Sequence, residues 1–135
     1  MQLTDIENSL PNGFHDAFIE SLNVDYTSKR ALIKLRLCIG DPDATTKEEK
    51  EAYKKADLEL LGLVYFVIDA PDNRYKFLET KELWIDGGEV KPGSSPSTPV
   101  PIEMLPKGTF AYWFFARDWN SFIHVAAMSA KLEWH

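Results

Sequence analysis

Two histidines and their acidic neighbours are the side chains of this sequence best suited to bind a metal or move a proton. His15 is followed directly by Asp16, and imidazole and carboxylate are both common metal ligands. A metal site of the His-Asp phosphohydrolase type needs further His and Asp ligands on other helices, and only His124 and the terminal His135 remain. The sequence therefore favours a structural role, in which His15 or Asp16 bonds the turn Pro11–Gly13. We expect no metal and no cofactor.

His124 lies within the apolar stretch Phe122–Trp134 and shares its strand parity with hydrophobic residues. A histidine on an apolar face is more often a hydrogen-bonded core residue than a catalytic one. The alternative is an acid–base or metal site, which requires His15 and His124 to face each other across strands with Asp16 or Asp118 nearby.

The last third of the chain is dense in aromatic residues and contains Trp113, Trp119 and Trp134. Neighbouring residues on a strand point to opposite faces, so Trp113 cannot share a face with Tyr112. One face must be covered by a helix, by a loop, by a second sheet or by a partner. An uncovered face would be a binding patch, and the three tryptophans could line a pocket for a small ligand.

The hydrophobic pattern predicts a mainly β (α+β) fold. Ala31–Ile39 alternates strictly between apolar and polar residues, as a half-buried strand does. Thr46 followed by Glu49 is a capping-box pattern and predicts a polar helix over Lys47–Ala56. Lys91–Pro106 holds five of the eight prolines and is expected to be an extended loop.

We expect six strands in consecutive antiparallel order, with the helix inserted between the second and third. They would form a single antiparallel sheet that is curled, or folded as a sandwich or a partly closed barrel. The predicted strands are His15–Tyr26, Ala31–Ile39, Asp57–Ala70, Tyr75–Asp86 and the two aromatic runs on either side of the break Asp118–Ser121.

Length and charge narrow the class of protein. The 135 residues suit one domain over residues 1–135, and the net charge of −6 makes nucleic acid and anionic membrane poor partners. No apolar run approaches the ~20 residues that span a bilayer. The N-terminus lacks the basic and apolar regions of a secretory signal, and the single cysteine excludes an internal disulfide, so a cytoplasmic location is expected.

The segment Leu10–Ala17, which reads LPNGFHDA, resembles the opening of a group of small bacterial proteins without assigned function. Later stretches, including Asp118–Phe122, also fit that group. The His15-Asp16 opening is similar to immunity protein family 50, whose members are thought to neutralise toxins of competing bacteria. This resemblance implies stoichiometric binding to a toxin domain, and the acidic balance would suit a basic nuclease.

The leading hypothesis is therefore a bacterial, non-enzymatic protein-binding module, immunity-like, that presents an aromatic and acidic surface to another protein. The alternatives are a small metal- or acid–base-dependent enzyme using His15, Asp16 and His124, and a small-ligand binder with a tryptophan pocket. A homodimer is a further expectation, because an exposed final strand offers its edge to a second copy.

Overall fold

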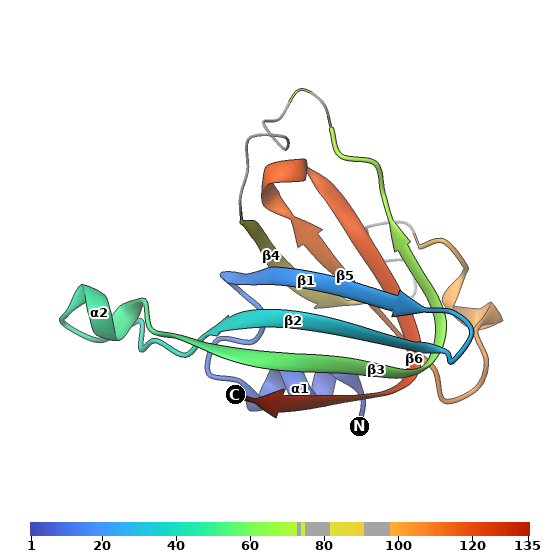
Figure 1. The fold of residues 1–135 in the computed structure, drawn as a ribbon, viewed down its shortest axis with the longest axis horizontal. Helices are drawn as coiled ribbons and strands as arrows, with labels where there is room; N and C mark the ends of the chain where they lie inside the picture. Colours follow the sequence, from blue (N-terminus) through green and yellow to red (C-terminus); the bar gives the residue numbers. More distant parts are fainter. Residues whose placement is uncertain (73, 75–81, 91–97) are drawn as a thin grey trace.

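The computed structural model describes residues 1–72, 74, 82–90 and 98–135. Six antiparallel strands form one sheet that closes into a barrel in the order β1-β2-β3-β6-β5-β4 (Figure 1). The mainly β, antiparallel prediction is confirmed. The strands are β1 (Ala17–Asp25), β2 (Arg30–Cys38), β3 (Tyr53–Ile68), β4 (Leu83–Glu89), β5 (Phe110–Ala116) and β6 (Ser121–Trp134).

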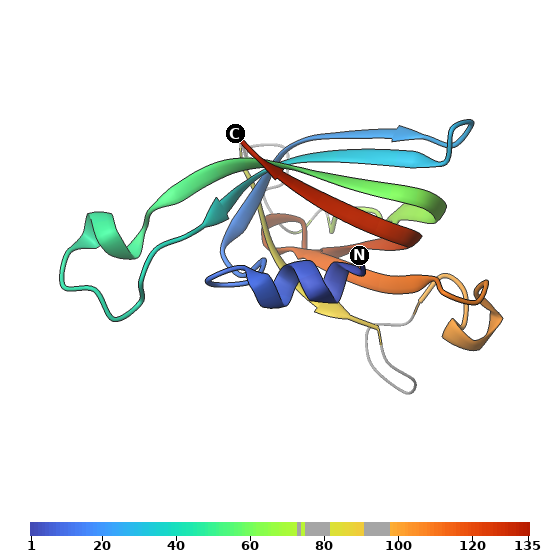
Figure 2. The same ribbon diagram turned by 90° about the horizontal axis from the view of Figure 1, so that it is seen from below.

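In the described part of the chain, four short helices join or flank these strands. An α-helix near the N-terminus lies against the barrel beside β6 (Figure 2), and it buries Leu3 and Ile6 in the core. The helices are α1 (Leu3–Ser9), α2 (Lys47–Lys50), η1 (Ile102–Met104) and η2 (Arg117–Trp119).

The strand order differs from the consecutive order expected from the sequence. β3 pairs with β6 rather than with β4, and β4 closes the barrel by pairing with β1. β3 has sixteen residues and β6 has fourteen, so each is long enough to belong to both halves of the barrel. The prediction failed because side-chain alternation identifies strands but does not identify their partners.

The helix predicted over Lys47–Ala56 is also shorter in the structure. Thr46 caps α2 by accepting a hydrogen bond from the Glu49 N–H, as the capping pattern indicates, but α2 ends at Lys50. β3 begins at Tyr53, and Ala56 is buried opposite Leu35. Pairing with β2 and burial therefore outweigh the local helix signal. The first part of the strand predicted from Tyr75, residues 75–81, lies outside the described residues.

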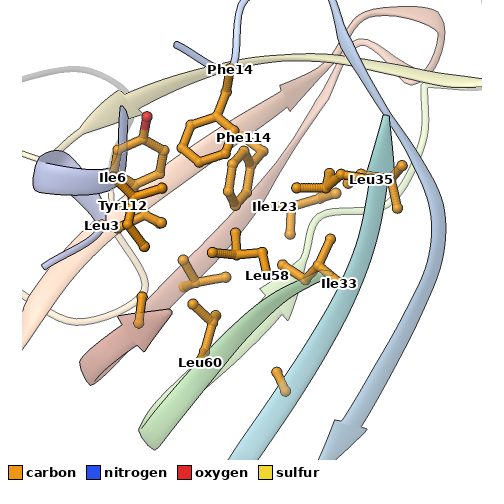
Figure 3. Packing of buried hydrophobic residues seen from close by; sticks show 14 of the residues in the cluster. Leu3, Ile6, Phe14, Ile33, Leu35, Leu58, Leu60, Tyr112, Phe114 and Ile123 are labelled. Carbon is orange, nitrogen blue, oxygen red and sulfur yellow. The ribbon is translucent and has the colours of Figure 1, made fainter. Parts of the chain in front are cut away.

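The barrel interior is filled by apolar side chains from all six strands, from α1 and from the segment before β1 (Figure 3). Phe14 meets Tyr112 and Phe114 edge-to-face, with ring centroids 5.9 and 5.4 Å apart. Phe14 directly precedes His15, so its burial fixes where the His-Asp pair leaves the core.

The opposite face of β5 carries Trp113 and Phe115, as strand alternation predicts. A second apolar cluster lies on this outer face and includes Val100, Ile102 and Leu105, which belong to the described part of the proline-rich stretch. This part of the predicted loop therefore covers one of the two faces. Gly88 lies beside the Trp113 ring, and a β-carbon there would approach the ring to 2.3 Å.

Candidate functional site

The His15-Asp16 pair lies where β1, β4 and β5 meet at one end of the barrel. Ala17 pairs with Ile85, and Ile85 pairs with Ala116, so these three buried residues form one row across the strands. The next residue of β4 is Asp86, whose side chain points outward because that of Ile85 points inward. Asp16 comes directly before Ala17, and Arg117 comes directly after Ala116. Because β5 runs antiparallel to β4, Phe115 is the residue opposite Asp86, and Arg117 reaches Asp86 and Asp16 through its long side chain.

Arg117 joins the two carboxylates. Its Nη2 lies 2.5 Å from Asp16 Oδ1, and its Nε lies 3.1 Å from Asp86 Oδ2. Asp16 has a positive φ of 57°, a conformation that Asp tolerates better than most residues, and its main-chain oxygen accepts a hydrogen bond from the Tyr53 hydroxyl. Two carboxylates side by side would repel each other without this shared guanidinium.

His15 is the fourth member of the cluster. Its Nδ1 lies 2.6 Å from Asp86 Oδ1 and its Nε2 lies 3.2 Å from Asp16 Oδ2, while 70% of its side chain is exposed. Both nitrogens can donate at once only in the imidazolium form. A general base needs one nitrogen directed at its substrate, and here each nitrogen faces a carboxylate. This arrangement suits an ion cluster that shapes the surface.

The pKa of Asp86 reflects this environment. Partial burial raises it, but the hydrogen bonds from His15 and Arg117 and the charges of both outweigh burial, so the Asp86 pKa is lowered. Burial lowers the pKa of Arg117, whereas Asp16 and Asp86 raise it by more, so the Arg117 pKa is raised. Asp86 and Arg117 thus stabilise each other's charged forms.

Beside this cluster lies a hollow of about 360 Å³, lined by Asp16, Glu51, Tyr53, Trp84, Arg117 and Asp118. Three of its lining residues are acidic and one is basic. Two are aromatic, and the Tyr53 and Trp84 rings meet edge-to-face at 6.0 Å. We refer to this hollow as the acidic–aromatic cleft. Aromatic faces and carboxylates together are the groups that attract an organic cation.

The aromatic wall of the cleft continues to Phe18, whose ring centroid lies 4.8 Å from that of Trp84. On the side of β2, the Arg36 guanidinium lies 5.6 Å from the Phe18 centroid and its Nε donates to Glu20. The same aromatic group therefore already packs against one guanidinium of the chain itself.

A larger groove of about 450 Å³ lies on the outer face of β1, β2, β3 and β6. Two of its four acidic residues are paired with basic side chains, since Glu59 binds both Arg30 and Lys131, and Asp57 binds His135. For Glu51 of the acidic–aromatic cleft, the nearest cation is Lys47 at 3.9 Å, and both side chains are exposed. We therefore regard the smaller cleft as the better candidate site.

The structure does not bring His15 and His124 together. His124 pairs with Trp113 on β5 and with Val67 on β3, so it lies two strands away from β4 and Asp86, roughly 10 Å at the usual strand spacing. Its side chain is only 4% exposed, and its Nε2 lies 2.9 Å from Asp69 Oδ2. His124 is thus a buried histidine with its own carboxylate.

The three candidate tryptophans are also dispersed. Trp113 lies in the middle of β5, Trp119 lies in η2, and Trp134 ends β6. Trp119 lies just before β6 and Trp134 is its last residue, so they are separated along the chain by this strand, which is roughly 45 Å long at the usual rise per residue. The Trp134 ring instead carries the Lys54 ammonium, 5.1 Å from its centroid. The aromatic residues that line the cleft are Tyr53 and Trp84.

Asp86 and Arg117 are site residues that the sequence did not predict. Asp86 looked like the polar end of a strand before Gly87, and Arg117 looked like the start of a turn. The one feature of the sequence that could have indicated them is that each is a charged residue at the end of an apolar stretch. Only the register that aligns Ala17, Ile85 and Ala116 shows that these ends meet.

A scan against protein-family models and searches of curated proteins and of solved structures found no match to this chain. In the described part of the chain, no group of three or more His, Cys, Asp or Glu is placed to hold a metal ion. Within those same residues, no helix has the length and apolarity needed to cross a membrane.

Asp86→Asn is expected to flatten the acid limb of the stability curve. A carboxyl whose pKa is lowered by folding stabilises the protein above its unfolded pKa, here 3.8, and that contribution is lost as pH falls through the folded pKa. The wild type should therefore have the higher melting temperature at pH 6, and the difference should shrink below about pH 4. Thermal unfolding followed by circular dichroism from pH 2.5 to 7 measures it. A pH-independent difference would contradict the assignment.

Proposed function

We propose that the protein is a non-enzymatic binding module whose acidic–aromatic cleft receives a cationic segment of another protein. The observation that carries the proposal is the composition of the cleft, which is lined by three carboxylates, two aromatic rings and one guanidinium that is already bound to Asp16 and Asp86. A lysine or arginine side chain entering the cleft would meet Glu51 and Asp118 at its rim and Trp84 on its wall.

The more specific proposal is that the protein is immunity-like, so that its partner is a toxin domain. A neutraliser of a basic nuclease needs an acidic surface, and the chain carries six more acidic than basic residues. Charge complementarity speeds association and sets specificity between such partners. The LPNGFHDA opening supports the same reading, because it contains the two residues that begin the cluster, His15 and Asp16.

Binding of a hexa-arginine peptide, measured by isothermal titration calorimetry at low salt, tests the cleft. Glu51→Gln and Asp118→Asn should each weaken binding by about two- to fivefold, as expected for partly exposed ion pairs. Glu103→Gln is the matched control, because it removes the same charge from an exposed residue in η1 and should leave the affinity unchanged. Hexa-glutamate should not bind.

The proposal would be overturned if Glu103→Gln weakened binding as much as the cleft variants do, since attraction to net charge alone would then explain the result. The immunity-like form has its own test. Co-expression with a panel of basic nuclease toxin domains should restore growth for at least one of them, and Asp118→Asn should reduce that protection. Peptide binding without protection would support the cleft as a site for cationic side chains. It would contradict the proposal that a toxin is the partner.

A further inference from the structure

The last residues of β6 form a free strand edge along the lower rim of the barrel (Figure 1). β3 pairs with β6 as far as Trp134, whereas β5 pairs with it only from Ser121 to Ala127. Among the described residues, no strand adjoins the other side of residues 128–134. Figure 2 shows α1 close to this part of β6.

The main-chain hydrogen bonds show which residues face the free side. The His135 N–H donates to the Lys55 carbonyl on β3, whereas the Ala130 N–H donates to the Met1 carbonyl, away from β3. Because bonding direction alternates along a strand, the N–H and C=O groups of Leu132 and Trp134 also point away from β3. Within the described part of the chain these groups have no hydrogen-bond partner.

We propose that this edge binds a second copy of the chain, by antiparallel pairing of β6 with β6 about a two-fold axis at Leu132. Closed two-fold pairing is the commonest way in which identical chains associate. The two Leu132 residues would exchange N–H···O=C bonds, and each Trp134 N–H would donate to the Ala130 carbonyl of the other copy. The Trp134 carbonyl of that copy would replace the Met1 carbonyl as the acceptor of the Ala130 N–H. The sheet β1-β2-β3-β6 would then continue into its copy.

Charge selects this register. With Leu132 opposite Leu132, Lys131 of one copy lies directly opposite Glu133 of the other, and the same pair recurs across the axis. Moving the register by two residues in either direction places Lys131 opposite Lys131 or Glu133 opposite Glu133. Like charges directly opposite each other destabilise paired strands, whereas opposite charges stabilise them.

The apolar side chains fit the same register. Trp134 would lie opposite Ala130, so that a large side chain meets a small one, and Leu132 would lie against its copy. Trp134 is 38% exposed, Met128 44% and Met1 69%, so this rim offers apolar surface that a second copy would cover. The edge of β1 that faces β4 is also unpaired after Ile19 in the described residues, but a bulge between Ile19 and Ser21 lies where that stretch begins, and bulges hinder edge pairing.

Sedimentation velocity of the full chain from 5 to 500 µM tests the proposal. The wild type should show concentration-dependent dimerisation. Glu133→Lys places lysines opposite each other at both charge pairs, and Lys131→Glu places glutamates opposite each other. Each variant alone should dimerise at least about tenfold more weakly, because two cross-strand pairs change from attractive to repulsive. A mixture of the two variants should restore dimers, since every pair is then of opposite charge.

A wild type that stays monomeric at 500 µM would overturn the proposal. So would a dimer that both single variants leave unchanged, because the interface would then lie elsewhere. Circular dichroism melts of both variants check that each is folded. Lys131 also binds Glu59, so Lys131→Met serves as a reference for the loss of that internal pair without a reversed charge.

Discussion

Replacing Phe14 with alanine is expected to lower the free energy of unfolding by about 3–5 kcal/mol. The Phe14 side chain is 1% exposed and packs edge-to-face against Tyr112 and Phe114 inside the barrel. Removing it leaves a cavity in a closed barrel whose strands cannot easily collapse, and it also removes two aromatic contacts. Urea denaturation at pH 7 measures the change.

Phe115→Ala is the matched control for this prediction. It removes the same atoms from the next strand position beyond Phe114, where the ring lies on the outer face, half-buried against Phe122. We expect a loss of about 1–2 kcal/mol, since less apolar surface leaves the solvent there. Equal losses in the two variants would show that Phe14 does not fill the barrel interior.

Phe14→Ala should also weaken the acidic–aromatic cleft, because Phe14 holds the chain at the point where His15 and Asp16 emerge. Binding of hexa-arginine should fall in Phe14→Ala, even at temperatures where the variant is fully folded, and should be unchanged in Phe115→Ala. Peptide binding thus distinguishes a variant that only lowers the free energy of unfolding from one that also displaces His15 and Asp16 at the surface.

Arg117→Met is expected to lower the free energy of unfolding by about 1–2 kcal/mol at pH 7. Methionine keeps much of the apolar stem, so the variant mainly removes the charge between Asp16 and Asp86. The Arg117 side chain is 36% exposed, and solvent therefore moderates the repulsion between the two carboxylates. Because protonation relieves that repulsion, the loss should shrink as pH falls below about 4.

Arg36→Met provides the comparison for Arg117→Met. Arg36 pairs with Glu20 and lies over Phe18, but it is more exposed, and among the described residues it bridges no pair of acids. Its loss should therefore cost under about 1 kcal/mol. In the double variant Arg117→Met/Asp86→Asn part of the stability should return, since only one carboxylate then remains. Additive losses would argue against the shared-guanidinium arrangement.

Local pattern was sufficient for those parts of the fold that depend on neighbouring residues. The alternation of Ala31–Ile39 predicts β2, and the capping residue Thr46 marks the start of α2. Alternation also predicts that Trp113 and Tyr112 lie on opposite faces of β5, because side-chain direction follows from strand geometry alone.

Partners distant in the sequence were decided only by the tertiary structure. Three features depend on which strands lie side by side. They are the pairing of β3 with β6, the end of α2 at Lys50 and the separation of His15 from His124. The rings of Phe18 and Trp84 meet beside the cleft for the same reason. A strand's pattern shows which face is buried, but many strands share that pattern, so it cannot select a neighbour.

The sequence by itself therefore determined that this protein is an acidic, antiparallel β protein with an aromatic-rich C-terminal hairpin. It singled out His15 and Asp16 but not what they bind. The closed barrel decided that, because it aligns the start of β1, Ile85 of β4 and the end of β5 in one row and so brings Asp86 and Arg117 to the pair. Composition and alternation are local properties, whereas this alignment exists only once the strands have closed on one another.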